Sequence, residues 1–164
     1  MIIKLNVLIL TMLGIGNSKY ASGTAASFVT CLIYILLYNF QVDILFLVLS
    51  VTLIFVFSVY SIDNFKNSFS QIDAKEIVID EFIGQSIPVL TIYNFLEKNN
   101  LSHFISYTFV AFVLFRIFDI LKPYPINKID KKMKNGLGVI LDDIVAGVYS
   151  VIALLIIIFF INHV

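Results

Sequence analysis

Apolar residues in this chain of 164 residues occur in long runs that short polar stretches interrupt. Because a membrane-crossing helix needs about 20 predominantly apolar residues, we interpret five runs as crossings: 24–40, 42–60, 82–96, 103–121 and 139–161. The pattern predicts an all-α fold, a multi-pass helical membrane bundle of about five spans plus short N-terminal and interfacial helices. Residues 1–13 are apolar but too few to span, so we expect a short helix there that lies on the membrane surface or re-enters it.

Glycine and proline mark where these runs end or bend. Residues 14–23, GIGNSKYASG, predict a loop before the first run. Pro88 lies inside the third run, where we expect a kink because proline lacks a backbone N–H and clashes with the preceding turn. Pro123 and Pro125 follow the fourth run and disfavour its continuation as a helix. No internal repeat or linker divides the sequence, which predicts a single domain over residues 1–164.

The composition supports a membrane protein. Hydrophobic residues make up 60 % and charged residues 13 % of the chain, about half the charged share of a soluble domain, and the mean hydropathy is +0.98. The net charge is zero, so no overall field attracts nucleic acid, and nothing in the sequence indicates an obligate protein partner. Cys31 is the only cysteine, so no disulfide forms within the chain.

Lysine and arginine predict the orientation, because they are enriched in the cytoplasmic loops of membrane proteins. Ten of the eleven fall in segments 1–23, 61–81 and 116–138, and only Lys98 falls in the turns on the other side. The three segments are therefore expected to face the cytoplasm. This assignment places four polar or glycine-rich stretches, distant in sequence, at one membrane face.

Acidic residues at this face occur at the ends of the predicted helices: Asp80, Glu81, Asp119, Asp142 and Asp143. Carboxylates are the ligands that Mg²⁺ prefers, with water and substrate phosphate completing its coordination. Neighbouring residues on a helix point about 100° apart, so we expect one acid of the 142–143 pair to face the site and the other to face a neighbouring helix or solvent. The alternative is that these acids only stabilise the first turns of helices.

Basic residues and glycine loops supply candidate phosphate ligands. Arg116 and Asp119 lie three apart on one helical face, which suits either a structural ion pair or a bidentate contact to phosphate. Lys122 offers a further charge nearby. Lysines of residues 128–134 are interpreted as the cytoplasmic signal and a contact to anionic headgroups. Glycines in 14–16, 22–24 and 135–138 precede helices, whose backbone N–H groups bind anions.

Three blocks of the sequence resemble the signature blocks of phosphatidylglycerophosphatase A: IVIDEFIG at 77–84, FRIFDILKPYPI at 115–126 and GLGVILDDIVAG at 136–147. The opening GIGNSKYASGT resembles the glycine-rich start of that family, which commonly has proline where this chain has Ser22. The resemblance covers about residues 13–150. Each block alone is weak evidence, whereas the combination is specific.

The resemblance implies a Mg²⁺-dependent enzyme of the bacterial cytoplasmic (inner) membrane, with its active site facing the cytoplasm. It would remove the terminal phosphate of the phospholipid phosphatidylglycerophosphate and leave phosphatidylglycerol. Carried over to this sequence, the resemblance assigns catalysis, as metal ligands or as the base that activates water, to five acids: Asp80, Glu81, Asp119, Asp142 and Asp143. Four of them, Asp80, Glu81, Asp142 and Asp143, are assigned to Mg²⁺. Phosphate binding falls to Arg116, Lys122, Gly23 and Thr24.

Two other functions agree with parts of the sequence. A small helical transporter or channel would use the intramembrane acids as an ion path, but these acids gather at one face rather than along the spans. A CDP-alcohol phosphotransferase also uses aspartate and metal in a membrane, but its spaced Asp-Gly, Ala-Arg and Asp pattern is absent from the sequence.

Overall fold

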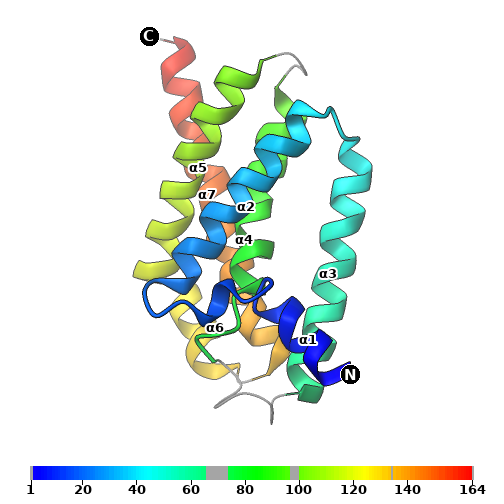
Figure 1. Cartoon of the computed structure of the whole chain (residues 1–164). Helices are drawn as coiled ribbons and strands as arrows, with labels where there is room; N and C mark the ends of the chain where they lie inside the picture. The colour runs from blue at the N-terminus through cyan, green and yellow to red at the C-terminus, as the bar shows by residue number, and fades with distance from the viewer. Residues whose placement is uncertain (1, 66–73, 97–99, 134, 164) are drawn as a thin grey trace.

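The structure, a computed structural model, describes residues 2–65, 74–96, 100–133 and 135–163. These residues form seven α-helices and one short 3-10 helix and contain no strand (Figure 1). The all-α prediction is confirmed. In chain order the elements are α1 (Ile2–Leu10), η1 (Ile15–Asn17), α2 (Ser22–Asn39), α3 (Ile44–Phe65), α4 (Ile79–Phe95), α5 (Leu101–Leu121), α6 (Ile126–Lys132) and α7 (Gly136–His163).

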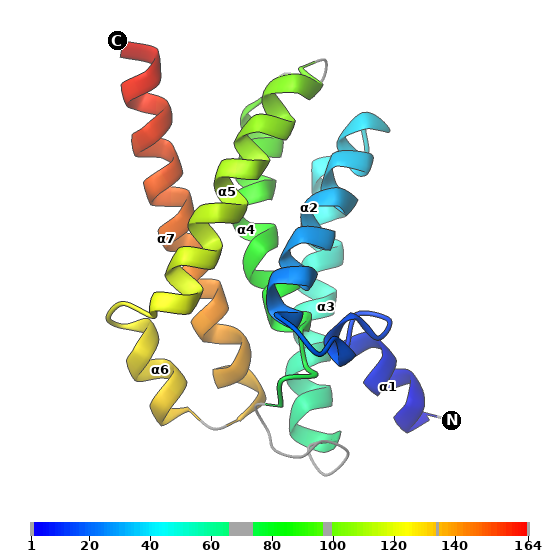
Figure 2. The same cartoon turned by 60° about the vertical axis from the view of Figure 1, so that its left-hand side comes forward.

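Helix α4 runs along the middle of the bundle and packs against α2, α3, α5 and α7. It begins at the end of the bundle where α3 finishes and ends at the opposite end, where α5 begins (Figures 1 and 2). The short helices α1 and α6 lie beside the end at which α2, α4 and α7 begin. We call this end the α6 end.

Four described helices are long and apolar enough to cross a membrane, and they correspond to the first, second, fourth and fifth predicted runs: α2, α3, α5 and α7. The third run forms α4, which has 17 residues and continues as helix through Pro88. A crossing by α4, and with it the total of five, stays a prediction.

Large apolar side chains remain exposed on the outer helices. On α3 they include Leu45, Phe46, Leu49, Leu53 and Val56, and on the second half of α7 they include Ile152, Leu155, Ile156, Phe159 and Phe160. Soluble monomers rarely expose so much contiguous apolar surface. Lipid chains would cover these faces, so the exposure agrees with a membrane protein.

Some boundaries differ from those expected. The loop predicted over 14–23 is too long, because α2 already begins at Ser22 and takes Gly23 into its first turn. Helix α1 confirms a short N-terminal helix, and α6 is a second short helix; their positions relative to a membrane stay predictions. Lys66, Lys98 and Lys134, which contribute to the predicted orientation, lie outside the described residues.

Helices α4 and α7 approach each other closely at two glycines. A Cβ atom on Gly84 would lie 2.7 Å from the carbonyl oxygen of Asp143, and one on Gly147 would lie 2.5 Å from the carbonyl oxygen of Gly84. Small residues allow helix backbones to pack this tightly. Pro88 contributes, because it lacks the N–H that would otherwise bond the Gly84 carbonyl. The contact brings the first turn of α4 beside Asp143.

Candidate active site

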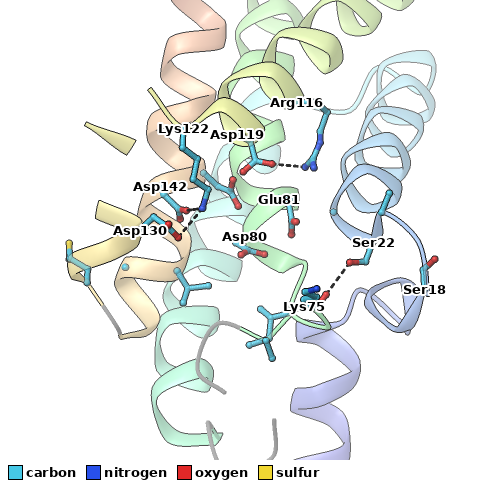
Figure 3. A pocket seen from close by; sticks show the side chains of 18 of the residues that line it. Ser18, Ser22, Lys75, Asp80, Glu81, Arg116, Asp119, Lys122, Asp130 and Asp142 are labelled. Atoms are coloured by element: carbon cyan, nitrogen blue, oxygen red, sulfur yellow. Dashed lines mark hydrogen bonds and ion pairs between the residues drawn. The ribbon is translucent and has the colours of Figure 1, made fainter. Parts of the chain in front are cut away.

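A cavity of about 520 Å³ lies at the α6 end of the bundle. Its walls come from the beginnings of α2, α4 and α7, the end of α5, and α6 (Figure 3). Eight of the nine predicted site residues line it: Gly23, Asp80, Glu81, Arg116, Asp119, Lys122, Asp142 and Asp143. Thr24 is not among the described residues that line the cavity. The predicted stretches therefore do converge, while the individual roles stay predictions.

Three carboxylates form the centre of the cavity. Asp80 and Glu81 come from the first turn of α4 and Asp143 from α7, and one oxygen of each lies within 4.8 Å of the others. Asp80 is 8 % and Asp143 3 % exposed. Asp80 Oδ1, Glu81 Oε2 and Asp143 Oδ1 are buried, and none has a hydrogen-bond partner in the described part of the chain.

The three carboxylates could hold a cation. Three like charges at this separation repel one another strongly in a poorly solvated site, and each unpartnered buried oxygen carries a desolvation cost. Hard divalent cations take oxygen ligands from one or a few carboxylates, and one oxygen from each of these three side chains lies close enough to the others to share an ion. The donor set therefore fits a hard divalent ion, and Asp80, Glu81 and Asp143 are the residues that could hold it.

Asp142 points away from this group, as expected for two adjacent acids on one helix. Its Oδ2 accepts a hydrogen bond of 2.9 Å from Lys122 Nζ, and the same ammonium lies 2.9 Å from Asp130 Oδ1 (Figure 3). Asp142 thus lies outside the group of three, and its predicted part in metal binding stays a prediction.

Lys122 lies just past the end of α5 and is held by these two carboxylates. Partial burial of the ammonium would by itself lower the pKa of Lys122, but the hydrogen bonds to Asp130 and Asp142 outweigh that effect and raise the pKa above its ordinary value. Lys122 therefore keeps its positive charge throughout the neutral pH range.

Arg116 forms the ion pair with Asp119 that the sequence suggested, and part of its guanidinium group remains able to bind a ligand. Its Nη1 lies 2.8 Å from Asp119 Oδ2 and 3.5 Å from Ser27 Oγ. Its Nε is buried and has no partner among the described residues. A buried N–H without an acceptor is costly, and an anion in the cavity would satisfy it.

The beginning of α2 completes this wall of the cavity. A Cβ atom on Gly23 would overlap the Glu81 carboxylate and lie 3.2 Å from Arg116 Nη1. Glycine leaves room here for two charged side chains to approach the backbone closely. Three helices, α2, α4 and α7, begin around the cavity (Figure 3), and the N–H groups and positive dipole ends of helix starts favour an anion such as phosphate.

Several lining residues were not predicted. Asp130, Lys19 and Lys75 border the cavity, and Ser22 Oγ donates a hydrogen bond of 3.0 Å to the Lys75 carbonyl oxygen. Asp130 follows the FRIFDILKPYPI block closely enough to have been a candidate. Lys19 and Lys75 lie in short irregular segments that carry no periodic signal, so only the folded chain brings them to the cavity.

Comparison with known proteins agrees with this geometry. Residues 8–158 match the family model described as Phosphatidylglycerophosphatase A. The chain is 35 % identical over 151 residues to a Bacteroides thetaiotaomicron protein named "Putative phosphatidylinositol-3-phosphatase", and the match covers 90 % of each chain. No solved structure matches the chain significantly.

Two further relatives match part of the chain. Identity to the Phosphatidylglycerophosphatase A of Haemophilus influenzae is 41 % over 80 residues, which is 49 % of this chain and 44 % of that protein. Identity to the Phosphatidylglycerophosphatase A of Escherichia coli is 41 % over 78 residues, which is 48 % of this chain and 41 % of that protein. This chain therefore matches less than half the length of these two relatives.

Proposed function

This chain belongs to the phosphatidylglycerophosphatase A family, and we propose that it hydrolyses the terminal phosphate monoester of phosphatidylglycerophosphate. The products would be phosphatidylglycerol and inorganic phosphate. The observation that carries the proposal is one cavity in which three carboxylates lie beside Arg116. Each carboxylate has a buried oxygen, and Arg116 a buried N–H, that has no partner among the described residues. A metal-assisted phosphatase needs both a cation site and an anion site in contact.

The name of the Bacteroides relative, "Putative phosphatidylinositol-3-phosphatase", indicates a different lipid substrate for that protein. Both lipids carry a phosphate monoester on a polyol headgroup. We favour phosphatidylglycerophosphate because the blocks at 77–84, 115–126 and 136–147 resemble those of its phosphatases, and because two relatives bear that name.

In the proposed mechanism Asp80, Glu81 and Asp143 would hold Mg²⁺. Bound there, the ion would neutralise phosphoryl charge and lower the pKa of the attacking water. Arg116 and the N–H groups at the beginning of α2 orient the monoester oxygens. Water attacks phosphorus, the bond from phosphorus to the headgroup oxygen breaks, and a carboxylate of the cavity takes the water proton and returns one to the leaving oxygen.

The protein is proposed to lie in the bacterial inner membrane with the α6 end of the bundle, including Lys75 and Lys122, facing the cytoplasm. Helix α4 is proposed as a fifth crossing, because it connects opposite ends of the bundle. Although α4 is shorter than the other long helices, it packs against α2, α3, α5 and α7. A transporter would need ionisable groups along the bundle. Apart from Asp43 at the opposite end, the described acids gather at the α6 end, which favours surface chemistry on a lipid headgroup.

The test is phosphate release by the purified protein in detergent from three lipids: phosphatidylglycerophosphate, phosphatidylinositol 3-phosphate and phosphatidic acid. We expect release from the first, dependent on Mg²⁺ and abolished by a chelator. Asp143→Asn should remove the activity, whereas Asp43→Asn, an acid that caps α3 at the far end, should retain it. No release from any lipid by folded protein would overturn the proposal, and preferential release from the second would reassign the substrate.

A further inference from the structure

The cations of the cavity fall into two sets. Arg116 and Lys122 are each held by carboxylates at 2.8–2.9 Å. Lys19 and Lys75 also line the cavity, yet neither side chain forms an ion pair or hydrogen bond within the described part of the chain. Lys75 lies across the cavity from Lys122 (Figure 3). Both cations are therefore available to a ligand in the cavity.

The segments that carry these lysines are fixed to each other. Ser22, just after Lys19, donates to the Lys75 carbonyl oxygen at 3.0 Å. Val78 N donates to the Leu10 carbonyl oxygen at 3.0 Å, and Gly16 packs so closely on the backbone of Glu76 that a Cβ atom would overlap it. The two segments that carry these lysines therefore form one built wall of the cavity rather than independent surface loops.

The segment that carries Lys19 also exposes large apolar side chains. Leu13 is 79 % and Tyr20 86 % exposed, and they lie on either side of Lys19 in the sequence. Exposed aromatic and aliphatic side chains beside lysine are typical of the headgroup level of a bilayer. The phosphodiester that links the glycerol backbone of a phospholipid to a polyol headgroup lies at that level.

Charge points in the same direction. The described lining residues include six acids and four bases, and Lys19 and Lys75 are half of the bases. Arg116 and Lys122 are already paired with carboxylates, so they cannot offset the negative charge that a substrate with both a phosphate monoester and a phosphodiester adds. A cavity of about 520 Å³ has room for a small polyol with two phosphate groups.

We propose that Lys19 and Lys75 bind the phosphodiester of the substrate while its monoester reaches Arg116 and the three carboxylates. The site would then select phospholipids whose polyol headgroup carries a monoester beyond the diester, and would disfavour phosphatidic acid, whose only phosphate is the monoester. This inference rests on the proposed function and deepens it, because it names the residues that determine headgroup selectivity.

The experiment compares a Lys19→Ala/Lys75→Ala double variant with the unmodified protein in mixed micelles. For phosphatidylglycerophosphate we expect KM to rise about tenfold or more, the effect of losing charge-assisted hydrogen bonds, with kcat within about twofold, since the diester is remote from the reacting phosphorus. The Ki of phosphatidic acid as a competitive inhibitor should not change. Both lysines are exposed and form no ion pair with another described residue, so the melting temperature should also be unchanged.

The matched control is Lys131→Ala/Lys132→Ala, which removes the same charge from exposed positions of α6 that do not line the cavity. It should leave the ratio of KM to Ki unchanged. An equal loss of affinity for both lipids in the Lys19/Lys75 variant would overturn the inference, because it would mean that the lysines bind phosphates of the bulk lipid. Unchanged KM would overturn it as well. If the unmodified protein releases no phosphate from any lipid, the proposed function itself has failed.

Discussion

Replacing Gly84 by alanine tests whether the close contact between α4 and α7 sets the geometry of the acidic cluster. The new Cβ atom would lie 2.7 Å from both the carbonyl oxygen of Asp143 and a ring carbon of Phe115. Ordinary contact requires about 3.5 Å, so the helices must separate by about 0.8 Å. Neither neighbour can yield easily, since one is backbone and the Phe115 ring is fully buried.

The separation should affect activity more than stability. Overpacking of this kind costs about 1–3 kcal/mol, partly offset by about 0.5–1 kcal/mol from the better helix propensity of alanine. The displacement moves Asp143 relative to Asp80 and Glu81, and a misplacement of about 1 Å lowers a rate by about 100-fold. We therefore expect kcat/KM to fall by about that factor in folded Gly84→Ala protein.

The assay is phosphate release from phosphatidylglycerophosphate across a Mg²⁺ titration, together with thermal unfolding in detergent. A matched control is Leu154→Ala, a fully buried position on α7 in the core cluster that also contains Phe104. This cavity should cost about 2–5 kcal/mol of stability while leaving kcat/KM and the Mg²⁺ requirement unchanged below the melting temperature. Unchanged activity and Mg²⁺ affinity in Gly84→Ala would refute the reasoning.

Three further predictions follow from the site. Asp143→Asn should lower kcat/KM by more than about 100-fold and abolish Mg²⁺-induced stabilisation. Asp142→Asn, which removes the negative charge paired with Lys122, should lower kcat/KM by about 10–100-fold and keep that stabilisation; equal thermal shifts would contradict the assignment. Mg²⁺ at about 100 times its Kd should add about 2.7 kcal/mol of stability to the unmodified protein, measured as a rise in melting temperature that a chelator reverses; no shift would count against the metal site. Asp63→Ala should destabilise the protein by about 0.5–2 kcal/mol, because Asp63 Oδ1 accepts a bond of 2.6 Å from Gly136 N at the beginning of α7, and an unaltered unfolding curve would show that this cap is dispensable.

The sequence carries most of the fold because apolar runs long enough to cross a bilayer have few alternatives to helix. The runs 42–60 and 103–121 correspond closely to α3 and α5. The start of α2 was harder to predict, because Ser22 and Gly23 belong to a glycine-rich stretch whose composition favours a loop. Their helical conformation depends on tertiary contacts, such as the bond from Ser22 to the Lys75 carbonyl.

Site residues could be predicted where charged residues interrupt an apolar run. They were harder to predict where helix packing determines which side chain faces the cavity. Asp142 and Asp143 stood out together, and helical geometry required them to diverge. Which of the two joins Asp80 depends on the rotation of α7, which Gly84 and Gly147 set through close backbone contact. No local pattern encodes that rotation.

The order of the helices along the chain has a consequence for biosynthesis. Asp80 and Glu81 enter with α4, but Asp143 arrives only with α7, which follows the other helices in this sequence. A nascent chain that has inserted α2 to α5 therefore holds an incomplete cluster and should neither retain Mg²⁺ nor turn over lipid. Transmembrane helices assemble after insertion. Two fragments divided between α6 and α7 should therefore regain Mg²⁺ binding and lipid turnover when they are produced together. Activity would then report that α7 has packed against α4.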